Sequence, residues 1–338
     1  MRKSPPDRIA TLRAATRAGI GELVRAAGIA KPRVCVGYSG GLDSAVLLDL
    51  LALEAAAGSI TVTAVHVHHG LSPNADVWSG HCAQVCSRLG IELQIERVRI
   101  KHQASQSPEE EARTARYAVF RRIQADAVAL AHHADDQAET VLLQLLRGAG
   151  PKGLAAMAAI GSRTARGSAP AYWRPLLSID RVQLAAYAVD AGLEWVEDES
   201  NRDLRLRRNY LRQRVLPVIA EVFPAPGRLL ARVARLQAQA ASLLEVLADL
   251  DLAMMALDGG LDCQRLAMLP GDRQANLLRR WLAQAGARAP SSARLAALQK
   301  AIVDSSNDTR LAWVHEGVRV VRRKAVLLLE NASPPSRD

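Results

Sequence analysis

The sequence predicts an α/β fold: a doubly wound, mostly parallel sheet with helices on both faces, followed by a smaller mixed α/β domain. Short apolar strand patterns alternate with amphipathic helical patterns through the first half of the chain. Two adjacent glycines, Gly40 and Gly41, stand where the first strand pattern meets its helix. At 338 residues, the chain exceeds the usual size of one domain, and its 49% hydrophobic content can fill two cores.

The first domain is predicted from alternating helix and strand patterns. Apolar residues three and four apart predict helices, and short apolar, β-branched runs predict strands. Glycines at 28, 148 and 150 mark helix ends. In chain order, we expect a helix over 9–27, a strand over 34–37, a helix from about 44, a strand over 60–67, a helix over 78–89, a strand over 91–98, a helix over 108–124, a strand over 126–131 and a helix over 135–147.

The pattern changes near residue 228, where a long amphipathic helix is expected over 229–252. A helix over 272–285 and a closing strand over 319–329 follow. These patterns predict a first domain over 1–227, a helical connector over 228–252, a second domain over 253–332 and a tail over 333–338.

The glycine pair lies in a turn of the kind that holds a phosphate. Glycine removes the Cβ penalty for positive φ and lets the backbone approach a ligand closely. Unpaired N–H groups and the positive dipole end of the following helix can then converge on an anion, with hydroxyls from Ser39 and Ser44. The alternative is a plain turn in which Ser39 or Asp43 only caps the helix.

Asp43 in this turn indicates a cation. A carboxylate beside phosphates repels them unless a divalent ion lies between, and this suggests Mg²⁺. The turn has no lysine, and the chain has no Gly-x-x-x-x-Gly-Lys-Ser/Thr segment, which excludes a Walker-type loop.

Three polar segments follow predicted strands: Ser39–Ser44, His66–His69 and His132–Asp136. In a parallel sheet, such segments meet at the carboxyl edge, so we expect them to form one site. The histidine spacing does not match an established zinc site, which leaves nucleotide contacts and helix capping by Asp135 as the preferred interpretations.

A net charge of +10 and an isoelectric point near 9.9 favour a polyanionic partner, although a compositional bias toward arginine would give the same charge. Six arginines fall between Arg202 and Arg214. A helix presenting them could contact an RNA backbone, with asparagine reading a base edge. The alternative is internal pairing with Glu197, Asp198, Glu199 and Asp203.

Other classes of protein are disfavoured. The chain has no 18-residue apolar stretch and no apolar segment near its first residues, which predicts a cytoplasmic protein without membrane association. Its four cysteines include no Cys-x-x-Cys pair, which argues against a disulfide scaffold or a zinc ribbon.

The segment Ser39-Gly-Gly-Leu-Asp-Ser44 resembles the pyrophosphate (PP) loop of the N-type ATP pyrophosphatases, which have a Rossmann-like fold. Further segments, in order, are His66-Val-His-His-Gly-Leu-Ser72, Glu110-Glu-Ala-Arg-Thr-Ala-Arg-Tyr117, His133-Ala-Asp-Asp-Gln-Ala-Glu-Thr140, Leu146-Arg-Gly-Ala-Gly150, Arg174-Pro-Leu-Leu177, Glu197-Asp-Glu-Ser-Asn201 and Arg208-Asn209. Together they resemble the tRNA(Ile)-lysidine synthetase family, strongly over 30–216 and more weakly through Arg279-Arg280-Trp281-Leu282.

The resemblance implies a ligase that uses ATP and Mg²⁺. The C2 oxygen of the wobble cytidine in an isoleucine tRNA with a CAU anticodon would attack the α-phosphate of ATP. Free lysine would then displace AMP, giving lysidine. The oligomeric state is left open, with a homodimer as one possibility.

The resemblance also implies roles for individual residues. The catalytic residues would be Asp43, Arg113, His133 and Asp136. The ATP contacts would be Ser39, Gly40, Gly41, Leu42, Asp43, Ser44 and His69, with Asp43 and Asp136 holding the metal. The tRNA contacts would be Arg205, Arg207, Arg208, Arg212, Arg279 and Arg280. For Arg113, the alternative is a solvated helix pair with the neighbouring glutamates.

Two other functions compete with this interpretation. A PP-loop tRNA thiolase generally needs paired redox or cluster-binding cysteines, and Cys82-x-x-x-Cys86 does not supply that pattern. A non-catalytic, nucleotide-sensing RNA-binding module would keep the glycines but would need neither Asp43 nor Asp136. Release of pyrophosphate from ATP distinguishes an enzyme from such a module.

Overall fold

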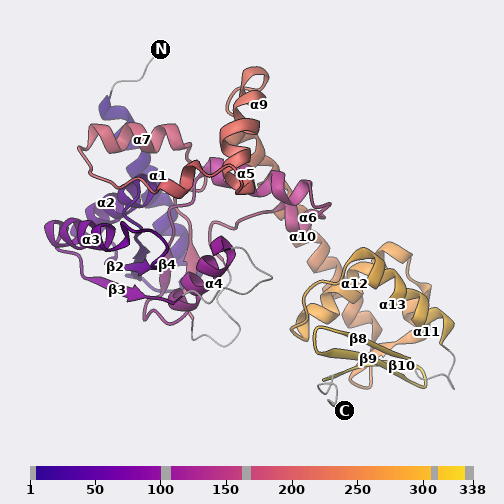
Figure 1. Ribbon diagram of the computed structural model, residues 1–338. Helices are drawn as coiled ribbons and strands as arrows, with labels where there is room; N and C mark the ends of the chain where they lie inside the picture. The colour runs from indigo at the N-terminus through magenta and orange to yellow at the C-terminus, as the bar shows by residue number, and fades with distance from the viewer. Residues whose placement is uncertain (1–4, 100–107, 162–168, 306–310, 332–338) are drawn as a thin grey trace. The chain divides into compact units, whose positions relative to one another are not determined.

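The computed structural model describes residues 5–99, 108–161, 169–305 and 311–331. The chain divides into two compact units, Met1–Gln237 and Ala238–Asp338 (Figure 1). The division falls within the long helix α10 (Pro226–Met255). The domain boundaries expected from the sequence stay predictions, and the expected tail over 333–338 lies outside the described residues.

The strands described in the first unit form a five-stranded parallel sheet in the order β3-β2-β1-β4-β5. They are β1 (Arg33–Gly37), β2 (Thr61–His68), β3 (Leu93–Arg97), β4 (Ala127–Ala129) and β5 (Ala171–Trp173). The predicted parallel sheet is confirmed. The sequence did not predict β5, because three residues are too few to show a strand pattern.

The five predicted helices of the first unit, α1 to α5, lie close to their predicted residues, whereas α6, α7 and α9 were not predicted. The described helices are α1 (Pro5–Ala27), α2 (Leu42–Ala56), α3 (Ala75–Leu89), α4 (Pro108–Phe120), α5 (Ala134–Leu145), α6 (Pro151–Leu154), α7 (Arg181–Asp190), α8 (Arg207–Tyr210) and α9 (Leu216–Val222). A 3₁₀ turn, η1 (Glu199–Arg202), and a π-helical turn, η2 (Leu211–Val215), complete the unit.

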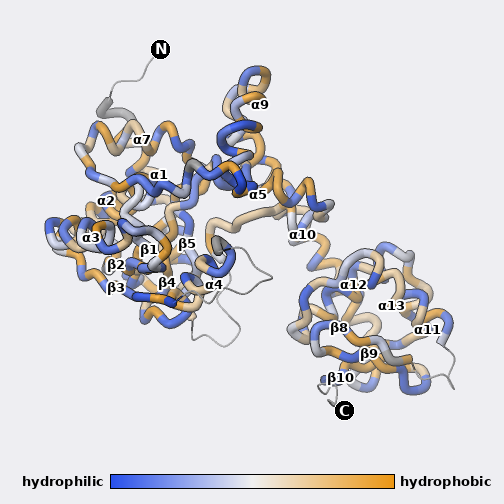
Figure 2. Tube along the Cα trace, in the orientation of Figure 1, coloured by the Kyte–Doolittle hydropathy of each residue, from blue (hydrophilic) through white to orange (hydrophobic). Residues whose placement is uncertain are grey.

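Helices cover both faces of this sheet, as a doubly wound fold requires. Alternate residues of β1 point to opposite faces. Val34 and Val36 belong to the larger apolar cluster, which α1, α2 and α7 also line. Cys35 packs in a smaller cluster with Val119 and Phe120 of α4. Figure 2 shows hydrophobic and hydrophilic residues interspersed along the helices, as expected when one face of each is buried.

The second unit has its own antiparallel sheet and its own core. The described strands follow the order β6-β7-β10-β9-β8. They are β6 (Ala256–Leu257), β7 (Gly260–Asp262), β8 (Ala312–His315), β9 (Val318–Arg323) and β10 (Val326–Asn331), with helices α11 (Cys263–Met268), α12 (Gly271–Gln284) and α13 (Ser292–Asp304). Leu277, Leu278 and Leu282 of α12 pack in one cluster with Val320 and Leu327 of the sheet. This confirms the predicted smaller α/β domain.

The prediction of one closing strand over 319–329 is wrong. That stretch forms a hairpin, in which β9 and β10 pair in antiparallel fashion. The chain reverses at Lys324, whose φ is 55°. Left-handed backbone usually marks glycine or asparagine, and neither is present at this turn, so the sequence looked like a continuous strand.

None of the described helices is both long and apolar enough to cross a membrane. The cysteines Cys35, Cys82, Cys86 and Cys263 are buried, and each has a free thiol.

Candidate functional site

The turn between β1 and α2 requires glycine at position 40. Gly40 has a φ of +85°, and a Cβ built there would lie 3.0 Å from Cys82 Sγ and 3.2 Å from Val196 Cγ2. Val196 N also donates to Gly40 O at 2.9 Å, which holds the turn against a later segment of the chain. Gly41, by contrast, has an ordinary φ of −76° and is the N-cap residue of α2.

The first turn of α2 keeps its backbone donors available for an anion. No side chain caps this helix, so the alternative of simple capping by Ser39 or Asp43 is wrong. The first backbone bond of the helix runs from Ala45 N to Gly41 O at 2.9 Å. Ser44 Oγ donates to Gly41 O at 2.9 Å and lies 3.0 Å from Ser39 Oγ. The N–H groups of residues 42–44 therefore stay outside the helical ladder, and such free donors at a helix N-terminus can bind an anion.

Two carboxylates meet at one histidine beside this turn. His133 Nε2 lies 3.7 Å from Asp43 Oδ2 and 3.4 Å from Asp136 Oδ2. Asp43 follows β1, whereas His133 and Asp136 follow β4, its parallel neighbour. The expectation that these segments meet at the carboxyl edge of the sheet is confirmed for these three residues.

His133 also begins helix α5. Its backbone N–H donates to Asp136 Oδ2 at 3.1 Å, and Asp136 N lies 3.4 Å from His133 Nδ1, which forms a reciprocal capping box. The expected capping by Asp135 is wrong, because Asp135 Oδ2 accepts instead from Arg181 N at 2.9 Å. His133 is thus held in place by the helix that it caps.

The charges around this cluster favour its ionised form. Burial alone would raise the pKa of Asp43, but the contact with His133 and the charges of Arg181 and Arg212 outweigh burial and lower that pKa. Burial opposes the charge on His133, whereas Asp43, Asp136 and Asp135 outweigh it and raise the pKa of the imidazole. The carboxylates therefore favour a proton on Nε2 of His133, which faces them, while Nδ1 accepts from Asp136 N.

A second ion pair lies behind Asp136. Arg212 Nη2 is 3.0 Å from Asp136 Oδ1, and Arg212 Nε donates to Glu139 Oε1 at 2.6 Å. Glu139 has no exposed surface, and burial raises its pKa. Sequence reasoning did not single out Glu139, although its position three residues after Asp136 puts both on one face of α5. Arg212 faces carboxylates of its own chain, and its contact with tRNA stays a prediction.

The histidines at the end of β2 and just after it have separate surroundings. His66 Nδ1 lies 3.0 Å from Tyr38 O and helps to hold the end of β1. His68 Nε2 lies 3.3 Å from Asp76 Oδ1. Burial, Arg116 and the neighbouring histidines lower the pKa of His69 to about 4. Its expected contact with ATP stays a prediction.

The remaining predicted arginines differ in their exposure and in their side-chain partners. Arg113 is exposed and lies over the ring of Tyr117, 4.9 Å from its centroid. Arg205 pairs with Asp203 at 2.8 Å, which is one of the internal pairs considered above. Arg208 Nη2 donates to Thr140 Oγ1 at 3.3 Å, whereas Arg207 is exposed. In the second unit, Arg279 is exposed and Arg280 pairs with Asp249 at 2.8 Å.

Asn209 cannot read a base, contrary to expectation. Its side chain is buried, and Nδ2 donates to Ser200 O at 2.9 Å and to Asp203 O at 3.0 Å. Glu199, in the same segment, accepts from Asn74 and Ser72 in the loop after β2. These bonds hold the segment around η1 against helix α8 and against the loop after β2.

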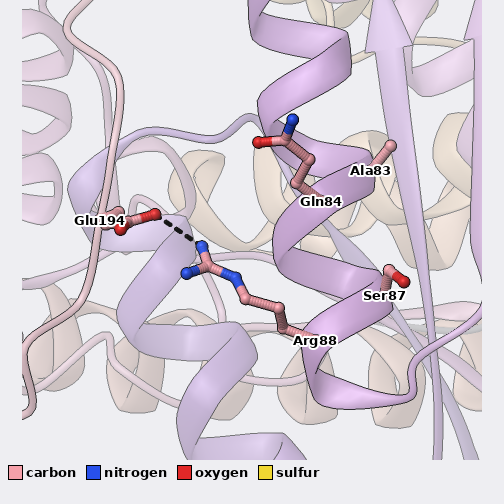
Figure 3. A pocket seen from close by; sticks show the side chains of 5 residues that line it. All are labelled: Ala83, Gln84, Ser87, Arg88 and Glu194. Atoms are coloured by element: carbon pink, nitrogen blue, oxygen red, sulfur yellow. Dashed lines mark hydrogen bonds and ion pairs between the residues drawn. The ribbon is translucent and has the colours of Figure 1, made fainter.

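A pocket of about 650 Å³ lies over α3 (Figure 3), and Asp43, His133 and Asp136 do not line it. Its lining residues are Ala83, Gln84, Ser87, Arg88 and Glu194. Arg88 Nη2 and Glu194 Oε2 form an ion pair across it at 2.6 Å. None of the predicted site residues lines this pocket, and we assign it no role.

The carboxylates at the edge fit Mg²⁺ bound together with phosphate. Among the described residues there is no group of three side chains that could hold a metal without other ligands. Mg²⁺ usually takes one or two carboxylates and completes its shell with phosphate oxygens and water. Asp43 Oδ1 is buried, has no hydrogen-bond partner and makes only a long ion pair of 3.7 Å with Arg181 Nε, which leaves it available to such an ion.

Comparison with known proteins follows the same division of the chain. A family model described as "PP-loop domain" matches residues 14–219, and one described as "TilS substrate binding domain" matches residues 261–327. The U34-tRNA thiolase NcsA from Methanococcus maripaludis, solved with its [4Fe-4S] cluster, has a similar fold. Its TM-score is 0.57 at 19% identity, and the match covers 69% of this chain and 80% of that one.

Two curated relatives are much more similar in sequence. The tRNA(Ile)-lysidine synthase of Chromobacterium violaceum is 48% identical over 77% of this chain and 59% of its own length. That of Methylococcus capsulatus is 44% identical over 90% of this chain and 69% of its own length. The chain thus spans less than two thirds of the Chromobacterium relative. On these matches, the chain belongs to the tRNA(Ile)-lysidine synthase family and carries its PP-loop domain.

Proposed function

We propose that this protein converts the wobble cytidine of an isoleucine tRNA with a CAU anticodon to lysidine. The C2 oxygen of the cytidine attacks the α-phosphate of ATP, pyrophosphate leaves, and free lysine then displaces AMP. The observation that carries the proposal is the placement of Asp43, His133 and Asp136 beside the uncapped N-terminus of α2. Family membership supplies the choice of substrates.

The turn residues bind the phosphates of ATP in this proposal. Gly40 and Gly41 allow close approach, and the N–H groups of residues 42–44 point at the pyrophosphate, with the hydroxyls of Ser39 and Ser44 beside them. Asp43 and Asp136 would hold Mg²⁺, which neutralises the charge that develops on the leaving pyrophosphate. His133 keeps these two carboxylates apart and in place.

The arginines act on the RNA side. Arg113 would stabilise the activated cytidine or the α-phosphate, and His69 would contact ATP. The tRNA contacts would be Arg205, Arg207, Arg208, Arg212, Arg279 and Arg280. Phosphate contacts of this kind position an RNA and leave its sequence to other groups. A homodimer stays a prediction.

The cysteines support this reaction over sulfur transfer. Burial raises the pKa of Cys82 to about 12 and that of Cys86 to about 11, so neither thiol is ionised near neutral pH. A thiolase needs a reactive or cluster-binding thiolate. Neither thiol of this pair is therefore poised to react as a free thiolate.

The test is incorporation of labelled lysine into isoleucine tRNA by the purified protein. We expect lysine incorporation together with formation of AMP and pyrophosphate, and only when tRNA is present. Asp43→Asn serves as the matched inactive control. Incorporation of sulfur, or binding of ATP and tRNA without any pyrophosphate, would refute the proposal in favour of a thiolase or a sensing module.

A further inference from the structure

Arg174, directly after β5, is a buried cation without an acidic partner. It is only 8% exposed, and its Nη1 donates to Ala158 O at 2.8 Å. Its Nε is buried and has no hydrogen-bond partner. Within the described residues, no aspartate or glutamate forms an ion pair with it. A buried charge without a counter-ion is strongly unfavourable, so this arrangement indicates an anion supplied from outside the chain.

Arg174 and His132 both follow strands that end at the carboxyl edge of the sheet, Arg174 after β5 and His132 after β4. Leu130 N donates to Trp173 O at 2.8 Å, and this bond brings the end of β4 beside the end of β5. Burial, opposed by Asp136, lowers the pKa of His132 to about 3, and the charges of Arg174, Arg113 and Arg208 lower it further. The imidazole is therefore neutral and adds no charge. Its Nδ1 is buried and has no hydrogen-bond partner.

Arg113 and Arg208, which also act on His132, contact only neutral groups in the described part of the chain. Arg113 lies over Tyr117, whose ring centroid is 5.0 Å from that of Tyr172 on β5. Arg208 donates to the hydroxyl of Thr140. Asp136, the carboxylate whose charge acts on His132, is already paired with Arg212 and His133.

We propose that Arg174, with Arg113 and Arg208 around His132, binds a backbone phosphate of the RNA next to the nucleotide that is modified. The inference rests on the proposed function, which brings an RNA to this edge. Both RNA and ATP carry phosphate oxygens that an arginine can bind. In the proposed function, however, the phosphates of ATP bind at the turn after β1. The sheet order places β4 between that strand and β5, so the arginine cluster lies to one side of the turn. The planar guanidinium fork suits a phosphodiester.

The test combines one protein change with one RNA change. The RNA is isoleucine tRNA with a methylphosphonate in place of one phosphate flanking the wobble cytidine, which removes a single charge. For the unchanged protein, we expect one such position to weaken tRNA binding about tenfold, the loss of a charged hydrogen bond. In Arg174→Gln, the same RNA change should have little further effect, the salt slope of tRNA binding should fall by about one, and ATP affinity should be unchanged. Arg174→Lys should restore part of the binding.

Other outcomes decide against the proposal. If the methylphosphonate weakens binding equally in both proteins, Arg174 does not contact that phosphate. If ATP affinity falls while tRNA binding is kept, the anion is a phosphate of ATP and the inference is wrong. Should Arg174→Gln fail to fold, Arg208→Gln goes through the same comparison, with Arg33→Gln at the opposite end of β1 as the control. If lysine is incorporated but the methylphosphonate weakens tRNA binding equally in the unchanged protein and the variant, this inference alone is refuted. If no lysine is incorporated, the proposed function is refuted.

Discussion

Glu139 accepts a hydrogen bond from Arg212 Nε at 2.6 Å, and this pair joins helix α5 to the π-helical turn η2. Glu139 has no exposed surface, and its second carboxylate oxygen has no hydrogen-bond partner. Arg212 is therefore the main counter-ion for a carboxylate buried directly behind Asp136.

Loss of this counter-ion should destabilise the first unit. We expect Arg212→Met to lower the free energy of unfolding by about 3 kcal/mol, because it leaves a buried carboxylate without its partner. The double change of Arg212→Met and Glu139→Leu should recover most of that loss. Chemical denaturation of both variants measures the effect. Equal stability of Arg212→Met and the unchanged protein would show that Glu139 is protonated in the folded state.

Asp43→Asn should leave the fold intact and reduce activity by about 10²-fold or more, as for loss of an electrostatic catalytic group. The change removes the negative charge nearest the uncapped end of α2. Steady-state release of AMP in the presence of tRNA measures the activity, and thermal unfolding checks the fold. Turnover near normal with an unchanged dependence on magnesium would exclude Asp43 as a metal ligand.

Gly40→Ala should impair ATP binding as well as stability. The added methyl group would meet Cys82 Sγ and Val196 Cγ2, and the residue must keep a φ of +85°. Gly28→Ala is the matched control, because Gly28 also has a positive φ, +67°, but has no neighbour within 4 Å of a built Cβ. We expect the control to cost about 1 kcal/mol in unfolding free energy and to keep full ATP affinity. Equal effects of the two changes on ATP affinity would contradict this role of the turn.

Arg207 and Arg208 should contribute to the salt dependence of tRNA binding. Each phosphate contact adds about one unit to the slope of log affinity against log salt, so a double change of Arg207 and Arg208 to Ala should lower it by about two. ATP affinity should change little. Binding titrations at several salt concentrations test this, with Arg33→Ala as a control. A double variant that loses thermal stability and both affinities together would show that these side chains hold the fold.

His69 should make stability depend on pH. Its pKa falls from the ordinary value of 6.5 to about 4 in the folded protein. Between these values, the unfolded chain binds a proton that the folded chain does not, so stability falls as the pH drops from about 6.5 toward 4 and changes no further below. Melting temperatures across that range should therefore decrease less steeply in His69→Gln. An unchanged slope would show that His69 is not buried as described.

The sequence predicted the parts of the site that lie next to strand ends. Asp43, His133 and Asp136 could be found because parallel strands bring their carboxyl ends to one edge, whatever the details of packing. The glycine pair was readable for a similar reason: positive φ at Gly40 is a local demand of the backbone.

Residues whose role depends on packing could not be found in this way. Glu139 lies on an amphipathic helix, where a glutamate ordinarily faces water, and only the approach of Arg212 from a distant segment explains its burial. An asparagine of the arginine segment was expected at a base edge, but the amide of Asn209 donates to two carbonyl groups inside the fold. The turn at Lys324 carries none of the residues that mark a hairpin, so the two strands beside it were read as one.

The bond from Val196 N to Gly40 O also sets an order of assembly during synthesis. β1, its turn and α2 leave the ribosome early, but the donor that fastens the turn arrives only with residue 196. The partner of Glu139, Arg212, is synthesised later still. Since nascent chains fold as they emerge, most of the parallel sheet can form while its ligand-binding edge is still open. The turn after β1 can thus be fastened by Val196 only after all five strands of the sheet have been synthesised.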